Sequence, residues 1–434
     1  MSSVETLGAL ERRLNAVIPQ QQLYGEIEAR LKRLGRTVKL HGFRPGKVPF
    51  RILQQQYGAQ VQQEVLGDAL KRSFTEAVQA NSLNVVGYPN FEVKTADPAA
   101  EQIEYSATFE VYPEIVLGDA GAETVERATY VLSDADIDNT ITTLRKQRAV
   151  FEPADRAAQN EDQARVDFSG KLDGAAFEGG DAKDVTVVLG TGHMLPEFEN
   201  AIIGMKAGET KSFDMTFPAD YHGKNVAGKQ VNFTITLHSV GAPRLPEIDA
   251  GFAKSLGVED GDAGKLKVEI RDNLAREVEN RLKARNKNNA MDLLLKIGQL
   301  EVPKALVDSD VQDLMQQAMR DMQERGVKIP KGASLPPELF AERAQRRVKL
   351  GLIMAELVKQ QGLEAKPEQV KAMLQNHAQS FEHPEEVVKW HYSDPSRLQE
   401  VKNMVLEDNV VAWVMGTAKV VDRVMEFNEL MGKS

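Results

Sequence analysis

The clearest group of residues able to bind another molecule lies near the N-terminus. Between Ala29 and Gln63 the chain carries eight basic residues and no acidic one. They are Arg30, Lys32, Arg33, Arg36, Lys39, Arg44, Lys47 and Arg51. Because the whole chain has a net charge of −10, this local cluster contrasts with its surroundings and suits an anionic surface such as RNA. The alternative is a solvated basic face that has no partner.

The middle of this cluster is the run 41–49, which reads HGFRPGKVP. Its two glycines permit positive φ and its two prolines lack an amide donor, so neither an ordinary helix nor a central strand can form there. We therefore predict a fixed, exposed loop. Phe43 would stand at its tip between Arg44 and Lys47, as an apolar anchor between two cations.

Other kinds of chemistry find no matching residues. A phosphate-binding P-loop needs four residues between its glycines, whereas three separate Gly42 from Gly46, and Val48 replaces the Ser or Thr that should follow the lysine. The seven histidines show no ligand spacing and there are no cysteines, so we expect no metal and no cofactor. No Ser-His-Asp or Gly-x-Ser-x-Gly arrangement indicates covalent catalysis.

Length and composition predict several domains. A chain of 434 residues with 42% hydrophobic content should form two to four of them. The absence of cysteine rules out disulfides and fits a reducing compartment. The N-terminus lacks the features of a signal peptide, and no apolar run approaches the ~20 residues that span a bilayer. These features predict a cytoplasmic protein without a membrane partner.

Hydrophobic periodicity divides the N-terminal third into two regions. Up to about residue 112 it predicts a strand near Leu14, a helix opened by Pro19, further helix, and strands near 85–86, 91–94 and 103–111. The next region, up to residue 149, has a predicted extended stretch at 129–132 and then a helix beginning at Ser133-Asp134.

The remainder changes character twice. Residues 150–245 read as short strands separated by glycine turns, one of them at 177–180, with a helix starting at Pro196. Residues 246–434 are helical in pattern, with helix starts near five prolines: Pro303, Pro337, Pro367, Pro384 and Pro395. Ten of the fourteen methionines lie there. They could be ordinary core residues or an adaptable binding surface.

The N-terminal loop resembles a known signature. The run Gly42 to Pro49, followed by Tyr57-Gly58-Ala59 and Val65 to Asp68, closely resembles the ribosome-docking signature of the bacterial trigger factor family, Gly-Phe-Arg-x-Gly-Lys. Pro45 stands where that family often has lysine. The resemblance implies ribosome binding by Gly42, Phe43, Arg44, Gly46 and Lys47.

Residues 150–245 resemble the FKBP-type prolyl isomerase domain, although their aromatic residues taken singly would be assigned to the core. Rotation about an X-Pro bond must break amide resonance against a barrier of ~18 to 20 kcal/mol, and it needs no proton or nucleophile. A dry aromatic pocket penalises the less dipolar twisted amide less than water does. The resemblance implies a pocket formed by Phe168, Phe177, Glu178, Val185, Met194, Leu195, Phe198, Tyr221 and Phe233. In the simplest FKBPs, tyrosine and tryptophan stand where Phe168 and Phe198 are.

The predicted fold class is therefore multidomain α+β. We expect an α+β ribosome-docking domain (1–112), a connecting arm (113–149) that packs with the C-terminal domain, an FKBP-like antiparallel β domain with one helix (150–245), and an all-α C-terminal chaperone domain with arms (246–434).

The resemblance implies a chaperone that binds nascent chains, keeps new proteins open for folding or export, and isomerises X-Pro bonds. Its expected partners are the large ribosomal subunit near the nascent-chain exit, through protein and rRNA, and unfolded nascent polypeptides. A homodimer is possible off the ribosome. Two alternatives stay open, an FKBP isomerase without ribosome association and an RNA-binding regulator.

Overall fold

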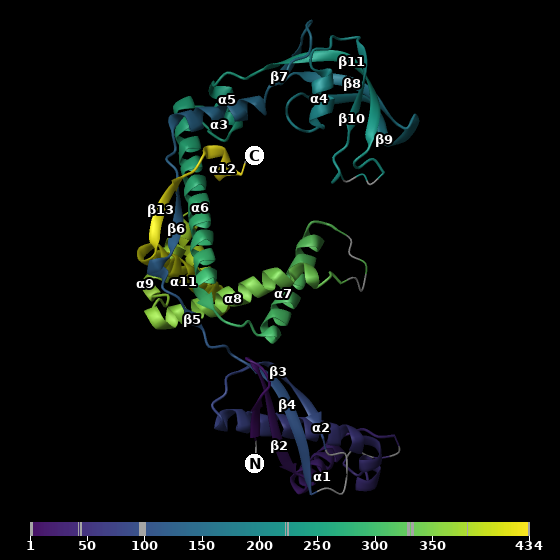
Figure 1. Cartoon of the computed structure of the whole chain (residues 1–434), viewed down its shortest axis with the longest axis vertical. Coiled ribbons are helices and arrows are strands. Elements are labelled where there is room, and N and C mark those ends of the chain that lie inside the picture. Colours follow the sequence, from purple (N-terminus) through teal and green to yellow (C-terminus); the bar gives the residue numbers. More distant parts are fainter. Residues whose placement is uncertain are drawn as a thin grey trace. The chain divides into compact units, whose positions relative to one another are not determined.

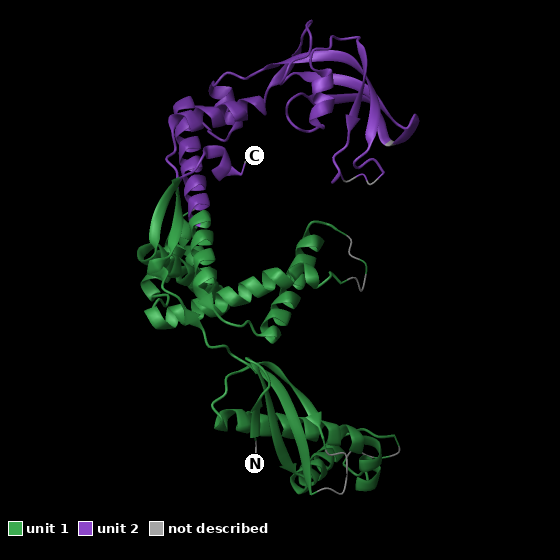
Figure 2. Cartoon of the chain, viewed as in Figure 1, with its two compact units in different colours: residues 1–128, 284–423 green, residues 129–283, 424–434 purple. Residues whose placement is uncertain are grey.

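The chain forms two compact units in this computed structural model, one made of residues 1–128 and 284–423 and the other of residues 129–283 and 424–434 (Figure 2). The structure describes residues 3–41, 43, 46–94, 101–221, 223, 225–327, 330, 334–379 and 381–432, without the side chain of Glu178. Each unit is built from stretches that lie far apart in the sequence, so neither corresponds to a single continuous segment.

The N-terminal part is a four-stranded antiparallel sheet covered by two helices (Figure 1). Its elements are β1 (Ser3–Thr6), β2 (Glu11–Pro19), α1 (Gln20–Thr37), α2 (Phe50–Ala80), β3 (Val85–Val93) and β4 (Gln102–Val111), with the strands in the order β1-β2-β4-β3. Alternation along β2 buries Leu14 and Ile18. Phe74 of α2 packs edge-on against Phe91 and Phe109 of the sheet, with centroids 5.7 and 5.1 Å away. The predicted strand, helix and sheet order is confirmed here.

One prediction in this region was wrong in its boundaries. The expected strands at 85–86 and 91–94 form one strand, β3, whose register shifts after Val86. Gly87 lies at that shift with φ of +70°, and a Cβ there would stand 2.7 Å from the Cβ of Ala305. A glycine bulge inside a strand reads as a turn in the sequence, which explains the error.

The extended stretch was predicted at 129–132, but the strand that forms there lies earlier in the chain and ends at residue 129. The strand is β6 (Thr124–Thr129), which pairs with β13 (Lys419–Val424). A second short pair joins β5 (Val116–Leu117) to β12 (Gly298–Gln299). The helix α3 (Asp134–Lys146) then begins as predicted, with a capping box between Ser133 and Asp136. The partner strands lie far along the chain, so local pattern could not place these pairings.

Residues 150–244 form the sheet module, an antiparallel sheet with one helix against it. Its elements are β7 (Val150–Pro153), β8 (Gln163–Leu172), β9 (Ala175–Val188), α4 (Pro196–Ile202), β10 (Thr210–Thr216) and β11 (Gln230–Arg244), with the order β10-β11-β8-β9 and β7 beside β11. The turn predicted at 177–180 is instead a bulged stretch of β9. Its pairing with β8 shifts register there, and Gly179 has φ of +80°.

The rest of the chain is predominantly helical. The helices are α5 (Ala250–Ser255), α6 (Ala263–Ile297), α7 (Lys304–Glu324), α8 (Glu338–Gln361), α9 (Pro367–Ala378), α10 (Pro384–Tyr392), α11 (Pro395–Thr417) and α12 (Phe427–Met431); the remaining helical turn is η1 (Ala120–Ala122). The predicted proline starts are confirmed, and Gly362 ends α8 with φ of +64°. Together with the mixed N-terminal part and the sheet module, these helices confirm the predicted multidomain α+β class. Among the described residues, no helix is long and apolar enough to span a membrane.

Candidate functional site

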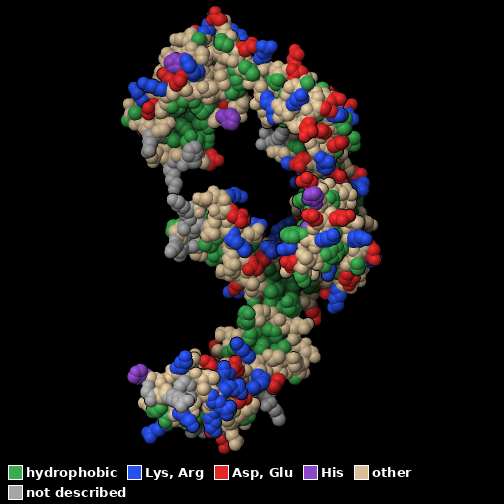
Figure 3. Space-filling model, turned by 180° about the vertical axis from the view of Figure 1, so that it is seen from behind, with side chains coloured by type: hydrophobic (Ala, Val, Ile, Leu, Met, Phe, Trp, Pro, Cys, Tyr) green, Lys and Arg blue, Asp and Glu red, His purple; other side chains and the backbone are tan. Residues whose placement is uncertain are grey.

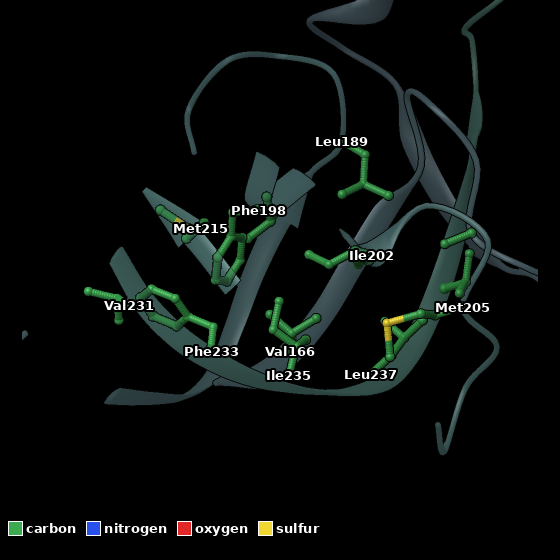
Figure 4. Packing of buried hydrophobic residues seen from close by; sticks show 14 of the residues in the cluster. Val166, Leu189, Phe198, Ile202, Met205, Met215, Val231, Phe233, Ile235 and Leu237 are labelled. Atoms are coloured by element: carbon green, nitrogen blue, oxygen red, sulfur yellow. The ribbon is translucent and has the colours of Figure 1, made fainter. Parts of the chain in front are cut away.

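A cluster of phenylalanine rings fills the space between α4 and the strands of the sheet module. Phe233 of β11 is at its centre and is 4% exposed. Figure 4 shows Phe233 and Phe198 of α4 pointing toward each other, beside Met215 and Val231. Five ring centroids lie 5.7 to 6.4 Å from that of Phe233, those of Phe168, Phe177, Phe198, Phe213 and Phe217. Most of these pairs meet edge to face, the geometry that aromatic rings prefer.

Two glycines allow the rings to lie directly on the strands. A Cβ at Gly170 of β8 would stand 2.7 Å from the ring of Phe233, and one at Gly180 of β9 would stand 2.7 Å from the ring of Phe177. No side chain fits at such distances. The rings are therefore held in place by backbone as well as by each other.

The outer side of the cluster is a rim of partly buried apolar side chains. Six of the predicted pocket residues pack against the buried core in this way, namely Phe168, Phe177, Val185, Met194, Leu195 and Tyr221. Phe198 and Phe233 belong to the buried core itself. The structure thus brings eight of the nine predicted residues together, while the side chain of Glu178 lies outside the described residues.

Sequence reasoning missed two members of the cluster, Phe213 and Phe217. Both come from the strand β10 and its end, where Phe213, Met215 and Phe217 alternate with exposed residues. That period of two was the available signal, since alternate residues of a strand face the same side. Phe217 also contacts the ring of Tyr221, with centroids 4.7 Å apart.

The cluster offers shape and dryness rather than acid–base groups. Apart from the hydroxyl of Tyr221, its described side chains are those of Phe, Val, Met and Leu, which have no proton to exchange. A nearby polar contact joins β8 and β11, where Asp167 accepts the N–H of Asp184 at 2.7 Å and lies 3.0 Å from Nε2 of His238. The hydrogen bond from the Asp184 N–H first, and that from His238 next, lower the pKa of the Asp167 carboxyl below its ordinary value. Among the described residues, no group of three or more acidic or histidine side chains could hold a metal ion.

The predicted docking loop lies between α1 and α2. Phe43 is 38% exposed, and its N–H donates to the carbonyl of Leu40 at 3.1 Å. Gly46 has φ of +82°, a conformation that requires glycine, and Lys47 is exposed. The helices on either side pack closely, because Gly35 of α1 leaves room for Leu53 of α2. Gly42 and Arg44 lie outside the described residues.

The basic cluster is smaller than the sequence suggested. Arg30 pairs with Asp68 at 2.8 Å and with Glu64 at 3.2 Å, and Lys32 pairs with Glu28 at 2.6 Å. These acids lie just outside the acid-free stretch, within reach across or along the helices. Arg33, Arg36, Lys39, Lys47 and Arg51 are exposed and form no ion pair with the described residues. Lys and Arg side chains gather on the face of the N-terminal part seen in Figure 3.

Comparisons with known proteins agree with this architecture. Residues 154–238 match the family of FKBP-type peptidyl-prolyl cis-trans isomerases. Residues 1–144 match the bacterial trigger factor protein family, and residues 263–416 match the C-terminus of the same family.

Full-length relatives carry the same name. The chain is 51% identical to the trigger factor of Nitrosospira multiformis over 434 residues, which covers 100% of both chains. It is 50% identical to the trigger factor of Burkholderia pseudomallei over 438 residues, or 98% of each chain. A solved structure of the trigger factor chaperone covers 96% of this chain and 100% of its own, with 18% identity and a TM-score of 0.45.

Fold, aromatic cluster and family matches define a multidomain chaperone that contains an FKBP-type peptidyl-prolyl cis-trans isomerase domain. The chain belongs to the trigger factor family. Its N-terminal part is the ribosome-docking domain of that family, and ribosome and nascent-chain binding follow from membership.

Proposed function

We propose that this chain docks beside the nascent-chain exit of the large ribosomal subunit through the loop 41–49, touching both ribosomal protein and rRNA. The observation that carries this proposal is an exposed Phe43 with Lys39 and Lys47 on either side along the chain, both exposed and neither in an ion pair with the described residues. An apolar anchor suits a protein groove, and exposed cations suit phosphate. Gly42, Phe43, Arg44, Gly46 and Lys47 are the proposed contacts, and the proposed compartment is the cytoplasm.

The proposed isomerase pocket is lined by the partly buried rim residues, and the buried rings of Phe198 and Phe233 form its base. A client proline would enter among Phe168, Phe177, Glu178, Val185, Met194, Leu195, Phe198, Tyr221 and Phe233, the residues assigned from family resemblance. There it would lose water, which stabilises the planar, more dipolar amide more than the twisted one. The close ring contacts around Phe233 would make the base of this pocket rigid. A rigid base would hold the proline in place while the bond rotates.

The proposed client surface lies on the helical segment 246–434. Several large apolar side chains are exposed there, among them Leu339 at 72% and Met404 at 56%. Such side chains can cover apolar stretches of unfolded nascent chains and keep them open for folding or export. The domain limits 1–112, 113–149, 150–245 and 246–434 belong to this proposal, as does a homodimer off the ribosome. The arm would join the helical domain through contacts such as the strand pair β6–β13.

Ribosome co-sedimentation tests the docking proposal. A variant with Phe43→Ala, Arg44→Ala and Lys47→Ala should no longer sediment with ribosomes under conditions where the wild-type chain is saturated. Peptide isomerisation should be unchanged, because the aromatic cluster lies in the sheet module. Docking should also weaken as salt rises, since exposed cations are screened.

A matched control removes the same three residue types elsewhere. Phe381, Lys389 and Arg343 are all exposed, and their replacement with alanine should leave docking intact. Undiminished docking by the loop variant would remove the loop from the proposal, and a wild-type chain that does not sediment with ribosomes would favour the isomerase without ribosome association. Tight binding of naked RNA with a steep salt dependence would favour the RNA-binding alternative.

A further inference from the structure

Beside the aromatic cluster lies a buried carboxylate that has no cation partner among the described residues. Glu199 follows Phe198 on α4 and is 5% exposed. The other buried acids have side-chain partners. Asp162 forms a bidentate ion pair with Arg156, and Asp136 accepts hydrogen bonds from the hydroxyl groups of Ser133 and Tyr130. Glu199 is different, because the hydrogen bonds that its carboxylate accepts from described residues come from backbone N–H groups.

Those N–H groups belong to the loop 189–195, which joins β9 to α4. Oε2 of Glu199 accepts the N–H of Gly190 at 2.8 Å, and Oε1 accepts the N–H of Met194 at 3.2 Å. One carboxylate therefore holds both ends of the loop. Gly190 has φ of +80°, and a Cβ there would stand 2.0 Å from Oδ1 of Asn160, so only glycine fits at the first attachment point.

The second attachment point leads straight into the rim of the cluster. Met194 and the next residue, Leu195, both pack against the buried core of the sheet module. Leu195 is also the N-cap of α4, and its carbonyl accepts the N–H groups of Phe198 and Glu199 at 2.9 and 3.1 Å. The position of this part of the rim is therefore tied to the carboxylate of Glu199.

A buried ionised group is costly for stability, because several kcal/mol of hydration are lost and only strong hydrogen bonds offset them. A neutral polar side chain would hold one N–H at a smaller cost, but it would not present two equivalent acceptors. We propose that Glu199 is a positioning residue for prolyl isomerisation, which fixes the loop 189–195 so that Met194 and Leu195 enclose the client proline. This inference rests on the pocket proposed above.

Replacement by glutamine keeps the shape of the side chain but removes its charge and one of its two acceptor oxygens. In Glu199→Gln the amide oxygen can accept one N–H, but the amide nitrogen then faces the other, and two donors repel. We expect kcat/KM for a prolyl peptide to fall by about tenfold or more, because small displacements of positioning groups have effects of this order. Glu197→Gln is the matched control, since Glu197 is exposed in the same turn of α4. It should keep the wild-type rate.

A spectroscopic readout distinguishes positioning from general structural support. In the full chain, amide signals of Gly190 and Met194 and the methyl signal of Met194 should shift in Glu199→Gln, while amides of β8 and β11 keep their wild-type shifts. A variant with displaced loop signals and an unchanged kcat/KM would overturn the proposal. So would lost activity with unchanged loop signals.

A second variant covers the case in which glutamine prevents folding of the sheet module. Glu199→Asp keeps the charge but is one methylene shorter, so it can reach only one of the two N–H groups; we expect a folded module with partial activity. Full activity, or a module that is unfolded in both variants, would overturn the proposal. Failure of the pocket assignment gives a different result, in which substitution of Phe233 leaves isomerisation intact.

Discussion

The sheet module and the outlying contacts of the C-terminal helices use apolar side chains in opposite ways, although α6, α8 and α11 also share a larger core around Leu294, Ile353 and Val410. The module gathers sixteen buried apolar residues into one core, which includes the rings of Phe198, Phe217 and Phe233. The contact between α7 and α8 has only four buried apolar residues, as does the contact of α9 with α11, and α10 buries none of its described residues. Large apolar side chains such as Leu339, Trp390 and Met404 remain exposed on these helices.

This difference separates two kinds of work on an unfolded chain. Catalysis on a single X-Pro bond needs rings held at fixed distances, which dense packing provides. Covering many different sequences needs apolar groups that adapt to each client, and thin packing leaves helices able to shift. The predictions below test whether the two properties are as separate as the structure indicates, beginning with the largest expected effect.

Replacing Phe233 with serine should damage the module most. Phe233 contacts five other rings, so its loss opens a cavity worth about 3 kcal/mol or more of unfolding free energy. Isomerisation of a prolyl peptide should fall by about 100-fold. Leu237→Ala is the control, because Leu237 is fully buried on the same strand outside the proposed pocket. It should destabilise the module similarly and retain activity while folded, as calorimetry and a peptide assay can show.

Deleting residues 150–245, with a short flexible joint in their place, should leave a folded protein that still suppresses aggregation of a denatured client. The cluster around Ile137, Ile141 and Phe252 contains no residue from the deleted range, so it can persist without the module. Circular dichroism should show the helices, and light scattering of an unfolding client should show protection. A folded deletion variant that protects nothing would move client capture into the sheet module.

Substituting Leu339 and Met404 with serine should weaken client protection a few-fold and change the unfolding free energy by less than about 0.5 kcal/mol, because exposed side chains contribute little to stability. Val150→Ser is the comparison, since Val150 is 65% exposed but belongs to the sheet module. Equal loss of protection in that variant would show that the client surface is not restricted to the helices.

The smallest expected effect is that of pH. Isomerisation should vary by less than about twofold between about pH 6 and 8, because its pocket works without proton transfer. A bell-shaped profile for the wild-type chain would contradict the desolvation mechanism.

Acid should act on stability instead, at the start of α3. Burial raises the pKa of Asp136, but hydrogen bonds from Ser133 and Tyr130 outweigh it, and the pKa in the folded chain is lowered. The ionised group is therefore stabilising above its ordinary pKa, and this contribution is lost as pH falls below about 4. Asp136→Asn should be less stable than wild type at neutral pH, and the difference should shrink in acid. Burial of Tyr130, and next its hydrogen bond to Asp136, raise the pKa of the Tyr130 hydroxyl to about 12. This hydroxyl therefore stays protonated and donates to Asp136 from acid to neutral pH.

The sequence predicted those parts of the molecule that short-range chemistry determines. Pro303, Pro367 and Pro384 each mark a helix start, because proline fixes φ and lacks the donor that the first helical turn does not need. The loop 41–49 could also be located from local chemistry, because two glycines and two prolines within nine residues exclude a regular helix or strand. Family resemblance, and not periodicity, supplied the pocket residues.

What could not be predicted depends on partners distant in sequence. The strand β13 needs β6, and Arg30 finds its acids on the next helix, so neither shows in a local window. Nothing in the sequence distinguishes Glu199 from an exposed acid in a first helical turn. Its burial depends on how the loop 189–195 folds over it, which no spacing in the sequence indicates.

The pairing of β6 with β13 has a consequence for the order in which this chain folds during its own synthesis. The core around Ala120 and Val125 also requires Leu294, Ile353 and Val410, so it cannot close until nearly the whole chain has been made. All strands of the sheet module, in contrast, lie within residues 150–244 and can pair as soon as that segment emerges. Residues 115–125 of this chaperone of newly made chains therefore stay unpacked until residues 290–414 have been made, whereas the N-terminal sheet and the sheet module close their cores without those residues.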